Sequence, residues 1–418
     1  MSKIKFLFAL CCLICLQSLS WAQIRIDAQL RNRFELRDGY KKLAADGANP
    51  TGIVSQRTRI SFAYKSDLLT LNITPQDVRL WGGDASWSSS GVATNNSIGL
   101  FEGYAEIKTG EKLSIKVGRQ AFKYDSQRML AARNWNQNGL SHDALLLKFK
   151  MKEWNLHLAG TWNNLSDLKA ENYYPSNRIK TLDFAWLNRN FNNNLTLSFL
   201  QLAAGTTDTD TTNTLNFRHT TGVYAQYTKG NFSAWGNAYY QYGKNTEAKA
   251  VSAFIVDFEA CYKTGKLSPG IGLSYLSGNS KTGSAQTTDK LFDVHYGARH
   301  SKFGAMDYFS SFVSQTQQGG LAHYFYFLDY QINNKVKINN KAQYFQLAQT
   351  NPLTPQNKNL GFENDLVLKY QFNEWGNLES GYCFFVPTGS LRTLQGVPNN
   401  KFSQFVYIQL TITPTLLK

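Results

Sequence analysis

Cysteine is scarce in this chain, and its few copies are unevenly placed. Three of the five cysteines, Cys11, Cys12 and Cys15, lie within the first 22 residues, and only Cys261 and Cys383 follow. A chain of 418 residues with so few thiols is not a disulfide-stabilised scaffold. No cysteine–histidine cluster has the spacing of a zinc site. The sequence therefore excludes small cross-linked secreted proteins and zinc-binding modules.

Long apolar runs are also lacking, with one exception at the N-terminus. A basic stretch, MSKIK, precedes the apolar FLFALCCLICL, and Ser20-Trp21-Ala22 offers a small-residue cleavage site before Gln23. These features predict a secretory signal peptide over residues 1–22. The alternatives are a membrane anchor, for which the run is too short, and a lipoprotein, for which no small-residue lipobox precedes a cysteine. The mean hydropathy of −0.37 argues against a further membrane-spanning helix.

Linkers are missing as well. No proline- or glycine-rich stretch and no shift of composition divides residues 23–418, which we predict to form one domain. Positive charge is abundant, with a formal net charge of +15, and the chain stays strongly basic without Lys3 and Lys5 of the signal peptide. Aromatic residues make up 14% of the chain, which is high for a soluble domain. An exported, aromatic-rich chain that is polar on average indicates an outer-membrane β-barrel.

The stretch QIRIDAQLRNRFELRD (23–38) shows the pattern that decides the fold class. Every second residue from Ile24 to Leu36 is apolar except Asn32, whereas the interleaved positions carry six charges. Successive side chains of a strand point to opposite faces, so one face is apolar and the other charged. Period-2 segments of about ten residues separated by turns are typical of transmembrane β-barrels. A soluble β-sandwich or propeller also alternates, but no domain break or blade repeat supports it.

The same alternation recurs to the C-terminus in roughly seventeen to nineteen segments, and the even strand number of bacterial barrels brings this to about eighteen. We therefore predict an all-β fold, a transmembrane antiparallel β-barrel of about 18 strands. The apolar face is expected to meet lipid, because an arginine at the bilayer midplane costs about 2–4 kcal/mol. The residues predicted to face lipid are Ile26, Leu30, Phe34, Ile60, Phe62, Val256, Phe258, Leu366, Leu368, Ile408 and Leu410. Those predicted to face inward are Arg31, Arg33, Arg57, Arg59, Lys341 and Cys261, the last as a free thiol.

Connections between the strands fall into two classes. Short turns are expected at TGK (264–266) and NEWG (373–376), and long polar loops at 82–97, 203–214 and 277–290. In outer-membrane barrels short turns face the periplasm and long loops lie outside. The segment GARHSKFG (297–304) has two interpretations, an inward-folded gate or an external loop packed on the rim.

Several motifs carry a resemblance to a known family. They are RNRFELRDGY, RTRISFAYKSD, QDVRLWGG, LFEGYAEIK, LSIKVGRQAFKYDSQRML, RNWNQNGLSHDALLLKF, RHSKFGAMDYF and LGFENDLVLKYQF…GYCFF. Together they resemble the outer-membrane alginate export family over most of the chain, although residues 150–290 match poorly. The resemblance implies an eighteen-stranded monomeric barrel whose arginine-rich lumen passes a polyuronate. It also implies lumenal roles for Arg31, Arg33, Arg57, Arg59, Asp77, Arg79, Glu102, Arg119, Asp125 and Arg128.

A path for anions is also physically reasonable. Arginine forks can replace part of the hydration shell of a carboxylate, and several weak sites in series allow passage where one deep site would trap the solute. Acidic residues among the arginines would hold them upright; these are Asp27, Glu35, Asp77 and Asp125. The alternative is that the arginines only brace the wall through salt bridges.

We therefore predict a passive, anion-preferring outer-membrane channel for an alginate-like polyuronate or another organic anion. Its expected partners are outer-membrane lipid, the solute and periplasmic polysaccharide-handling proteins, with no nucleic acid and no cofactor. A general anion-preferring porin is the closest alternative. A structural surface barrel plugged by its own side chains is a further one.

An enzyme is the least favoured interpretation. A barrel hydrolase would draw on Ser141, His142 and Asp143 in SHDALLL, but neighbours on a strand point to opposite faces and no GxSxG context is present. His295, His300 and Asp307 could suggest a metal, yet they fit a loop or a strand end better. We predict neither a catalytic site nor a metal site.

Overall fold

The structure is a computed structural model that describes residues 23–83, 98–165, 173–280, 286–350 and 357–418. The predicted signal peptide lies outside the described residues, as do residues 84–97 and 281–285 of two expected long loops.

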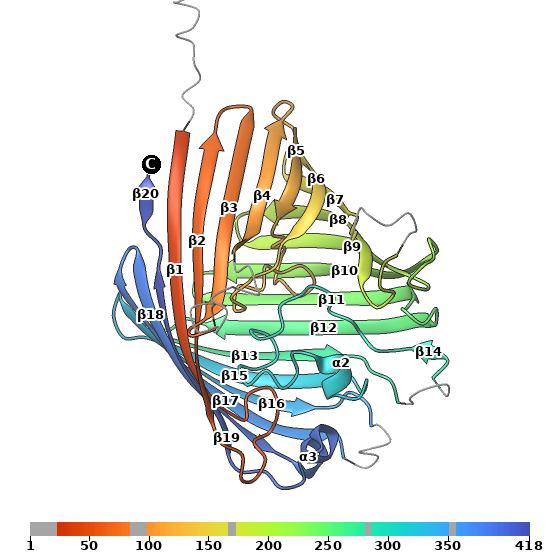
Figure 1. Cartoon of the computed structure of the whole chain (residues 1–418), viewed down its shortest axis with the longest axis vertical. Helices are drawn as coiled ribbons and strands as arrows, with labels where there is room; N and C mark the ends of the chain where they lie inside the picture. Colours follow the sequence, from red (N-terminus) through yellow and green to blue (C-terminus); the bar gives the residue numbers. More distant parts are fainter. Residues whose placement is uncertain (1–22, 84–97, 166–172, 281–285, 351–356) are drawn as a thin grey trace, which may run out of the picture.

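Eighteen antiparallel strands of the described chain form a closed barrel (Figure 1). Each of these strands pairs with the next one along the chain, and closure comes from β1, which pairs with both β2 and β19. The strands are β1 (Gln23–Asp38), β2 (Thr51–Lys65), β3 (Leu69–Leu80), β4 (Ile98–Lys108), β5 (Leu113–Gln120), β6 (His142–Met151), β7 (Trp154–Thr161), β8 (Ile179–Phe191), β9 (Leu195–Thr207), β10 (Leu215–Lys229), β11 (Phe232–Lys244), β12 (Ala250–Tyr262), β13 (Leu267–Leu276), β15 (Leu321–Gln331), β16 (Val336–Gln346), β17 (Asn359–Asn373), β18 (Gly376–Pro387) and β19 (Ser403–Ile412).

Four short elements complement the barrel. Strand β14 (Thr288–Asp289) runs parallel to the start of β12, and β20 (Thr415–Leu417) pairs with β1. Helix α2 (Phe312–Gln315) lies in the connection between β13 and β15, and α3 (Gly389–Gln395) lies between β18 and β19 and buries Leu391.

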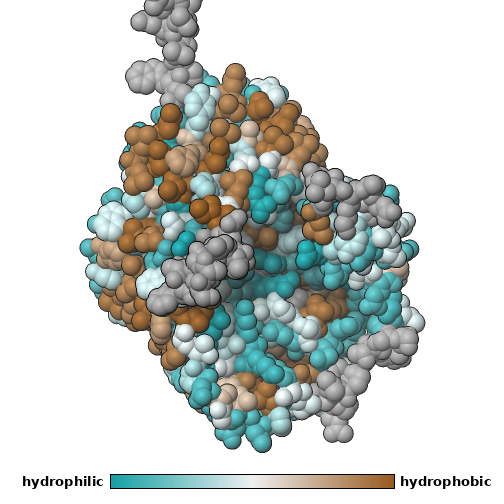
Figure 2. Space-filling model, in the orientation of Figure 1, coloured by the Kyte–Doolittle hydropathy of each residue, from teal (hydrophilic) through white to brown (hydrophobic). Residues whose placement is uncertain are grey.

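The alternation seen in the sequence separates an apolar outer wall from a polar inner one. Nine of the eleven residues predicted to face lipid are exposed on the barrel, and Ile26 and Leu410 are half-buried. Figure 2 shows apolar residues gathered on the upper outer surface, where β1 to β4 lie in Figure 1, and hydrophilic residues around the central hollow. This apolar outer surface packs against no other described part of the protein, as expected of a surface that meets lipid.

The connections are short at the barrel end where β1 begins and β19 ends, and long at the other end, as predicted. The turns at 264–266 and 373–376 are as expected, joining β12 to β13 and β17 to β18. The loop expected at 203–214 is shorter, because β9 continues to Thr207.

Long connections fold into the barrel and fill its centre. The two largest are the β5–β6 segment (121–141) and the β13–β15 segment (289–320), which bury Phe122, Leu130, Phe292, Phe303, Met306, Tyr308 and Phe309 to 1% exposure or less. The GARHSKFG stretch belongs to the second segment, so its inward placement is confirmed and the external rim interpretation is wrong. The hydrophobic core therefore lies inside the barrel and is made largely of loops.

Cys261 and Cys383 are free thiols. Cys261 shares the inner face of β12 with Asp257, as predicted, and Cys383 on β18 is fully buried. Five strand steps of about 4.8 Å separate β12 from β18 along the wall, far beyond the reach of a disulfide.

We expect a small maleimide to modify Cys261 in the folded barrel and Cys383 only after unfolding, as read by mass spectrometry. A Cys261–Cys383 disulfide in the purified protein would contradict this arrangement.

Candidate functional site in the barrel lumen

Four arginines of β1 and β2 lie on the inner face of the wall. Arg31 is paired in register with Arg57, and Gln29 with Arg59. Arg31, Arg33 and Arg57 are 3%, 5% and 1% exposed, so none of them borders open solvent widely. Their inward orientation agrees with the alternation of the sequence.

These arginines hold one short piece of the β5–β6 segment, residues 134–138, which we call the carbonyl segment. Arg31 donates from Nη1 to the carbonyl oxygen of Asn134 (2.7 Å) and from Nη2 to that of Asn136 (3.1 Å). The carbonyl oxygens of the other three residues accept from Arg33 (2.9 Å, Trp135), Arg57 (3.3 Å, Gln137) and Arg59 (3.0 Å, Asn138). Five consecutive carbonyls thus point at four guanidinium groups.

Carboxylates are unevenly shared among the four. Glu35 binds Arg33 Nε at 2.6 Å and also pairs with Arg37. Within the described residues, no carboxylate lies within ion-pair distance of Arg31, Arg57 or Arg59. The Nε of Arg57 is buried without a hydrogen-bond partner. The direct contacts of these three cations are therefore with neutral groups, and the nearest acids act on them only from beyond ion-pair distance: Glu379 on Arg31 and Glu102 on Arg59.

An inner cavity of about 560 Å³ lies beside this cluster, between the β1–β8 wall and the β5–β6 segment. Glu102 and Asp125 are the acids on its surface, and aromatic rings of Phe101, Tyr124 and Trp186 line it. Neither acid neutralises a lining cation: Glu102 accepts from the backbone N–H of Ala121 (2.9 Å), and Asp125 accepts from Trp186 and Ser198. Burial raises the pKa of Asp125, and these hydrogen bonds oppose the shift. The lining cations are Arg57, Arg59, Lys116, Lys123 and Lys148, of which Lys148 forms an ion pair with Glu106 at 2.8 Å.

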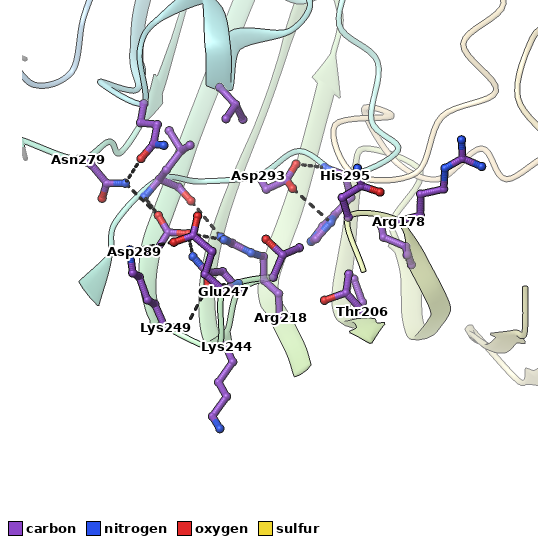
Figure 3. Close-up of a pocket in the computed structure, with 18 of the residues that line it drawn as sticks. Arg178, Thr206, Arg218, Lys244, Glu247, Lys249, Asn279, Asp289, Asp293 and His295 are labelled. Atoms are coloured by element: carbon purple, nitrogen blue, oxygen red, sulfur yellow. Dashed lines mark hydrogen bonds and ion pairs between the residues drawn. The ribbon is translucent and has the colours of Figure 1, made fainter. Parts of the chain in front are cut away.

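Two further cavities have better balanced charges. The outer cavity, about 580 Å³ at the long-loop end, is shown in Figure 3. Its Arg218 is paired with Asp289 at 2.5 Å and its Lys249 with Glu247 at 2.8 Å. The third, the Trp135 cavity of about 420 Å³, has three lysines and three acids on its surface, with ion pairs Lys337–Asp329 (2.7 Å) and Lys369–Glu379 (3.1 Å). Counted over the lining lysines, arginines and acids, five cations face two acids in the inner cavity, five face three in the outer cavity and three face three in the Trp135 cavity.

Three predicted lumenal residues lie on the other face of the wall. Asp77 and Arg79 pair in register with Thr58 and Gln56, opposite in phase to Arg57 and Arg59, and form an ion pair with each other at 2.6 Å. Arg119 shares its face with Val117, which is 49% exposed, and pairs with the exposed Asp143 at 3.0 Å. The predicted inward orientation is wrong for these three. They sit near the long-loop ends of β3 and β5, where the wall outside the apolar band accepts charge.

Arg128 lies inside the barrel, as predicted, but it holds a buried ion pair. Its Nε and Nη2 donate to the two carboxylate oxygens of Asp257 on β12, each at 2.7 Å, and the ion pair is 1% and 0% exposed at its two side chains. Ser274 accepts a third bond from Nη2 at 3.1 Å. This pair fastens the β5–β6 segment to the far wall.

The two inward segments are also fastened to each other. Ala298 donates from its backbone N–H to the carbonyl of Gln127 (2.8 Å), and Arg133 donates to the carbonyl of His295 (2.7 Å). The ring of Trp135 stacks on His300 with 3.8 Å between centroids, and Arg33 lies over Trp135 at 3.9 Å. These contacts join the two segments into one packed unit. This unit lies between the outer cavity on one side and the inner cavity and Trp135 cavity on the other.

The sequence of the barrel matches the model of a known protein family. A model of the alginate export family matches residues 22–402, nearly the whole barrel. The chain belongs to the alginate export family. A search of curated proteins found no match.

Solved structures with the same fold are also outer-membrane barrels. OccAB1 of Acinetobacter baumannii is 13% identical, with a TM-score of 0.64 over 96% of this chain and 99% of that one. OccAB4 of the same organism is 15% identical (TM-score 0.64, 94% and 98%), and OpdK of Pseudomonas aeruginosa with vanillate is 11% identical (TM-score 0.62, 94% and 98%). At these identities the likeness concerns the fold. The family and the barrel together place this alginate export family member in the outer membrane as a channel.

Sequence reasoning missed one pair of residues in this family member. Glu363 Oε1 accepts from the backbone N–H of Met306 (2.9 Å), and Asp365 Oδ2 accepts from that of Ala305 (3.2 Å). Gly304 has φ +91°, and a Cβ there would lie 2.4 Å from the Glu363 carboxylate, so only glycine fits. The pattern GFENDL was visible as a family motif, but its role as a clamp on GARHSKFGAM needs the fold.

The remaining candidates do not assemble a reactive site. His142 stacks on Phe122 inside the barrel, whereas Asp143 is on the outer face, as expected of strand neighbours. His300 contacts Asp307 (3.0 Å), whereas His295 lies near Asp293. No group of three metal-ligating side chains occurs in the part of the chain that the structure describes.

Proposed function

We propose that this channel passes anionic saccharides, alginate-like polyuronates or related organic anions, passively and as a monomer, through a cation-bearing lumen. The observation that carries the proposal is the inner cavity, which is lined by five lysines and arginines. Among the described residues, only Lys148 of these five forms an ion pair, with Glu106, and the two lining carboxylates accept hydrogen bonds from neutral donors instead. It catalyses no reaction and needs no cofactor. Periplasmic polysaccharide-handling proteins would be its partners.

Electrostatics supports a preference for anions. A low-dielectric wall focuses the field of its charges into the lumen, so screening over about 8 Å in physiological salt does not remove their effect on an ion inside. Among the described residues, no carboxylate lies within ion-pair distance of Lys116, whose cross-strand neighbour Glu106 pairs with Lys148 instead. Lys116 lies 3.5 Å from the ring centroid of Tyr104, and the hydrogen bonds of Arg59 go to neutral groups. Both can exchange these contacts for a passing carboxylate.

The solute class draws support from two sources. Membership of the alginate export family favours a saccharide bearing carboxylates. The solved structure of OpdK contains vanillate, which keeps a smaller organic anion as the second candidate. Aromatic rings beside the cations of the inner cavity would suit either one, since sugar rings and aromatic acids both stack on aromatic faces.

Replacing Arg59 and Lys116 together with glutamine should weaken anion preference. Each cation about 4 Å from an anion in water contributes about 1 kcal/mol, a factor of about five, so removing two cations should lower the anion-over-cation permeability ratio at least about fivefold. The measurement is the reversal potential of single channels in a planar bilayer under a salt gradient. In the wild type, trigalacturonate should also block current more than the neutral maltotriose.

The matched control is the double variant R79Q/R119Q. It removes the same charge from the outer face of the wall and should leave the reversal potential unchanged. A cation-selective wild-type pore, or equal shifts in the two double variants, would contradict the proposed function.

A further inference from the structure

Three arginines of β1 and β2 have no direct ion-pair partner among the described residues. Arg31, Arg57 and Arg59 adjoin one another through the register of the two strands, and no carboxylate among the described residues lies within 4.0 Å of any of them. Like charges at this spacing repel, and buried cations without counter-charges are costly. Neutral carbonyl oxygens of the carbonyl segment occupy the places where anionic oxygens would be more stabilising.

Most of the hydrogen bonds that hold the carbonyl segment come from the arginines of β1 and β2. The side chains of Asn134, Asn136 and Asn138 are exposed, so the segment buries little apolar surface at these positions. Gln137 is buried, but its contacts are polar: its Oε1 accepts from Arg31 (2.9 Å) and its Nε2 donates to Ser55 (2.8 Å). The arginines therefore supply most of the hydrogen bonds that hold the segment. Further anchors are the bond from Gln76 Nε2 to the Asn138 carbonyl (3.2 Å), the Gln137–Ser55 bond and the ring of Trp135, which stacks on His300.

Carboxylates are the stronger ligands for the same donors. Charge-assisted guanidinium–carboxylate bonds are about twice as strong as bonds to neutral acceptors and can be bidentate. Each carboxylate offers about four acceptor sites, so two or more are needed to replace five carbonyls and to balance three cations. The inner cavity, whose surface includes Arg57 and Arg59, brings a solute to this cluster.

We propose that the carbonyl segment is an internal strap that occupies an anion site, and that a solute with two or more carboxylates displaces it from Arg31, Arg57 and Arg59. This inference rests on the proposed function and adds a regulatory step to it. The lumen next to β1 and β2 is narrowed by the strap until an oligocarboxylate such as an oligouronate arrives. A monocarboxylate displaces it weakly, because one carboxylate leaves two cations unbalanced.

A nitroxide label on the exposed position 136 tests the displacement. The variant N136C/C261S, reconstituted in liposomes, carries the label, and buried Cys383 stays unlabelled. Electron paramagnetic resonance should show a restrained label alone, and a mobile component that becomes dominant with trigalacturonate. Galacturonate monomer should produce a small change and maltotriose none.

Two further variants show the label with the carbonyl segment released and with the segment held in place. Adding R57Q should leave the label mobile without any solute, whereas adding R79Q, on the outer face, should change nothing. If R57Q does not insert, the titration of the label in the wild-type arginine background decides.

The outcomes separate this inference from the proposed function. A label that stays restrained while trigalacturonate blocks the current would overturn the strap and leave the anion channel standing. A cation-selective pore whose current trigalacturonate does not block, and whose label it does not mobilise, would overturn both the strap and the proposed function.

Discussion

Replacing Arg128 with methionine is expected to release the β5–β6 segment (121–141) from the far wall of the barrel. The change leaves the carboxylate of Asp257 buried at 1% exposure without a counter-charge, while the packing volume on Phe303 is largely kept. Removing one partner of a buried ion pair costs about 3–5 kcal/mol. Since about 1.4 kcal/mol is a factor of ten, amides of 121–141 should exchange hydrogen at least about 100-fold faster.

The control for this prediction is another arginine ion pair of the same chain. Arg119 and Asp143 are exposed, so R119M should change exchange little, because exposed pairs contribute about 0–1 kcal/mol. The double variant R128M/D257L should recover much of the protection, since an apolar pair replaces the isolated charge. Equal exchange in R128M and R119M would show that the buried pair does not anchor the segment.

Replacing Gly297 with alanine is expected to force the two inward segments apart. An added Cβ would lie 1.8 Å from the carbonyl oxygen of Arg128 and 3.0 Å from that of Val294, and both are backbone atoms that cannot rotate away. The shift would break the bridge between Leu130 and Tyr296 and the bonds from Arg133. Overpacking costs about 1–3 kcal/mol, and the open-channel conductance should rise as the loops separate.

The same substitution at an open position isolates the steric effect. A Cβ on Gly99 would meet nothing within 4 Å, so G99A should match the wild type in conductance and in thermal unfolding. If G297A also keeps the wild-type conductance, the contact between the two segments does not restrict the lumen.

Lys302 illustrates how the interior loops change ordinary side chains. It lies in the β13–β15 segment with its Nζ 4.2 Å from the ring of Trp235. Burial, and secondarily the nearby Arg128, lower its pKa to about 8. The positive charge of Lys302 is therefore lost as the pH rises past about 8. We expect this loss to reduce the anion preference of the channel at alkaline pH.

The alternation of the sequence determined the barrel because two solvents act on the two faces of each strand. Leu30 and Phe34 must face lipid, so Arg31 and Arg33 must face inward, and no distant contact can reverse that phase. The same rule places Arg119 on the outer face of β5, in phase with the apolar Leu113, Ile115 and Val117. The predicted lumenal position of Arg119 disregarded this alternation, which is visible in the sequence. The outward Asp77 could likewise be read from the phase of Ile73.

What the arginines touch was decided only by the tertiary structure. Arg31 and Arg57 bind backbone carbonyls about 80 to 105 positions away, and Arg128 binds Asp257 across the barrel. Backbone carbonyls have no side-chain signature, and alternation says nothing about loops that fold inward. Within the apolar band, the sequence determined which side chains enter the lumen, because lipid excludes charge from the other face there. The folded loops determined which of those charges are already bound, because their own oxygens accept from some of them, whereas Lys116 has no ion-pair partner within the described part of the chain.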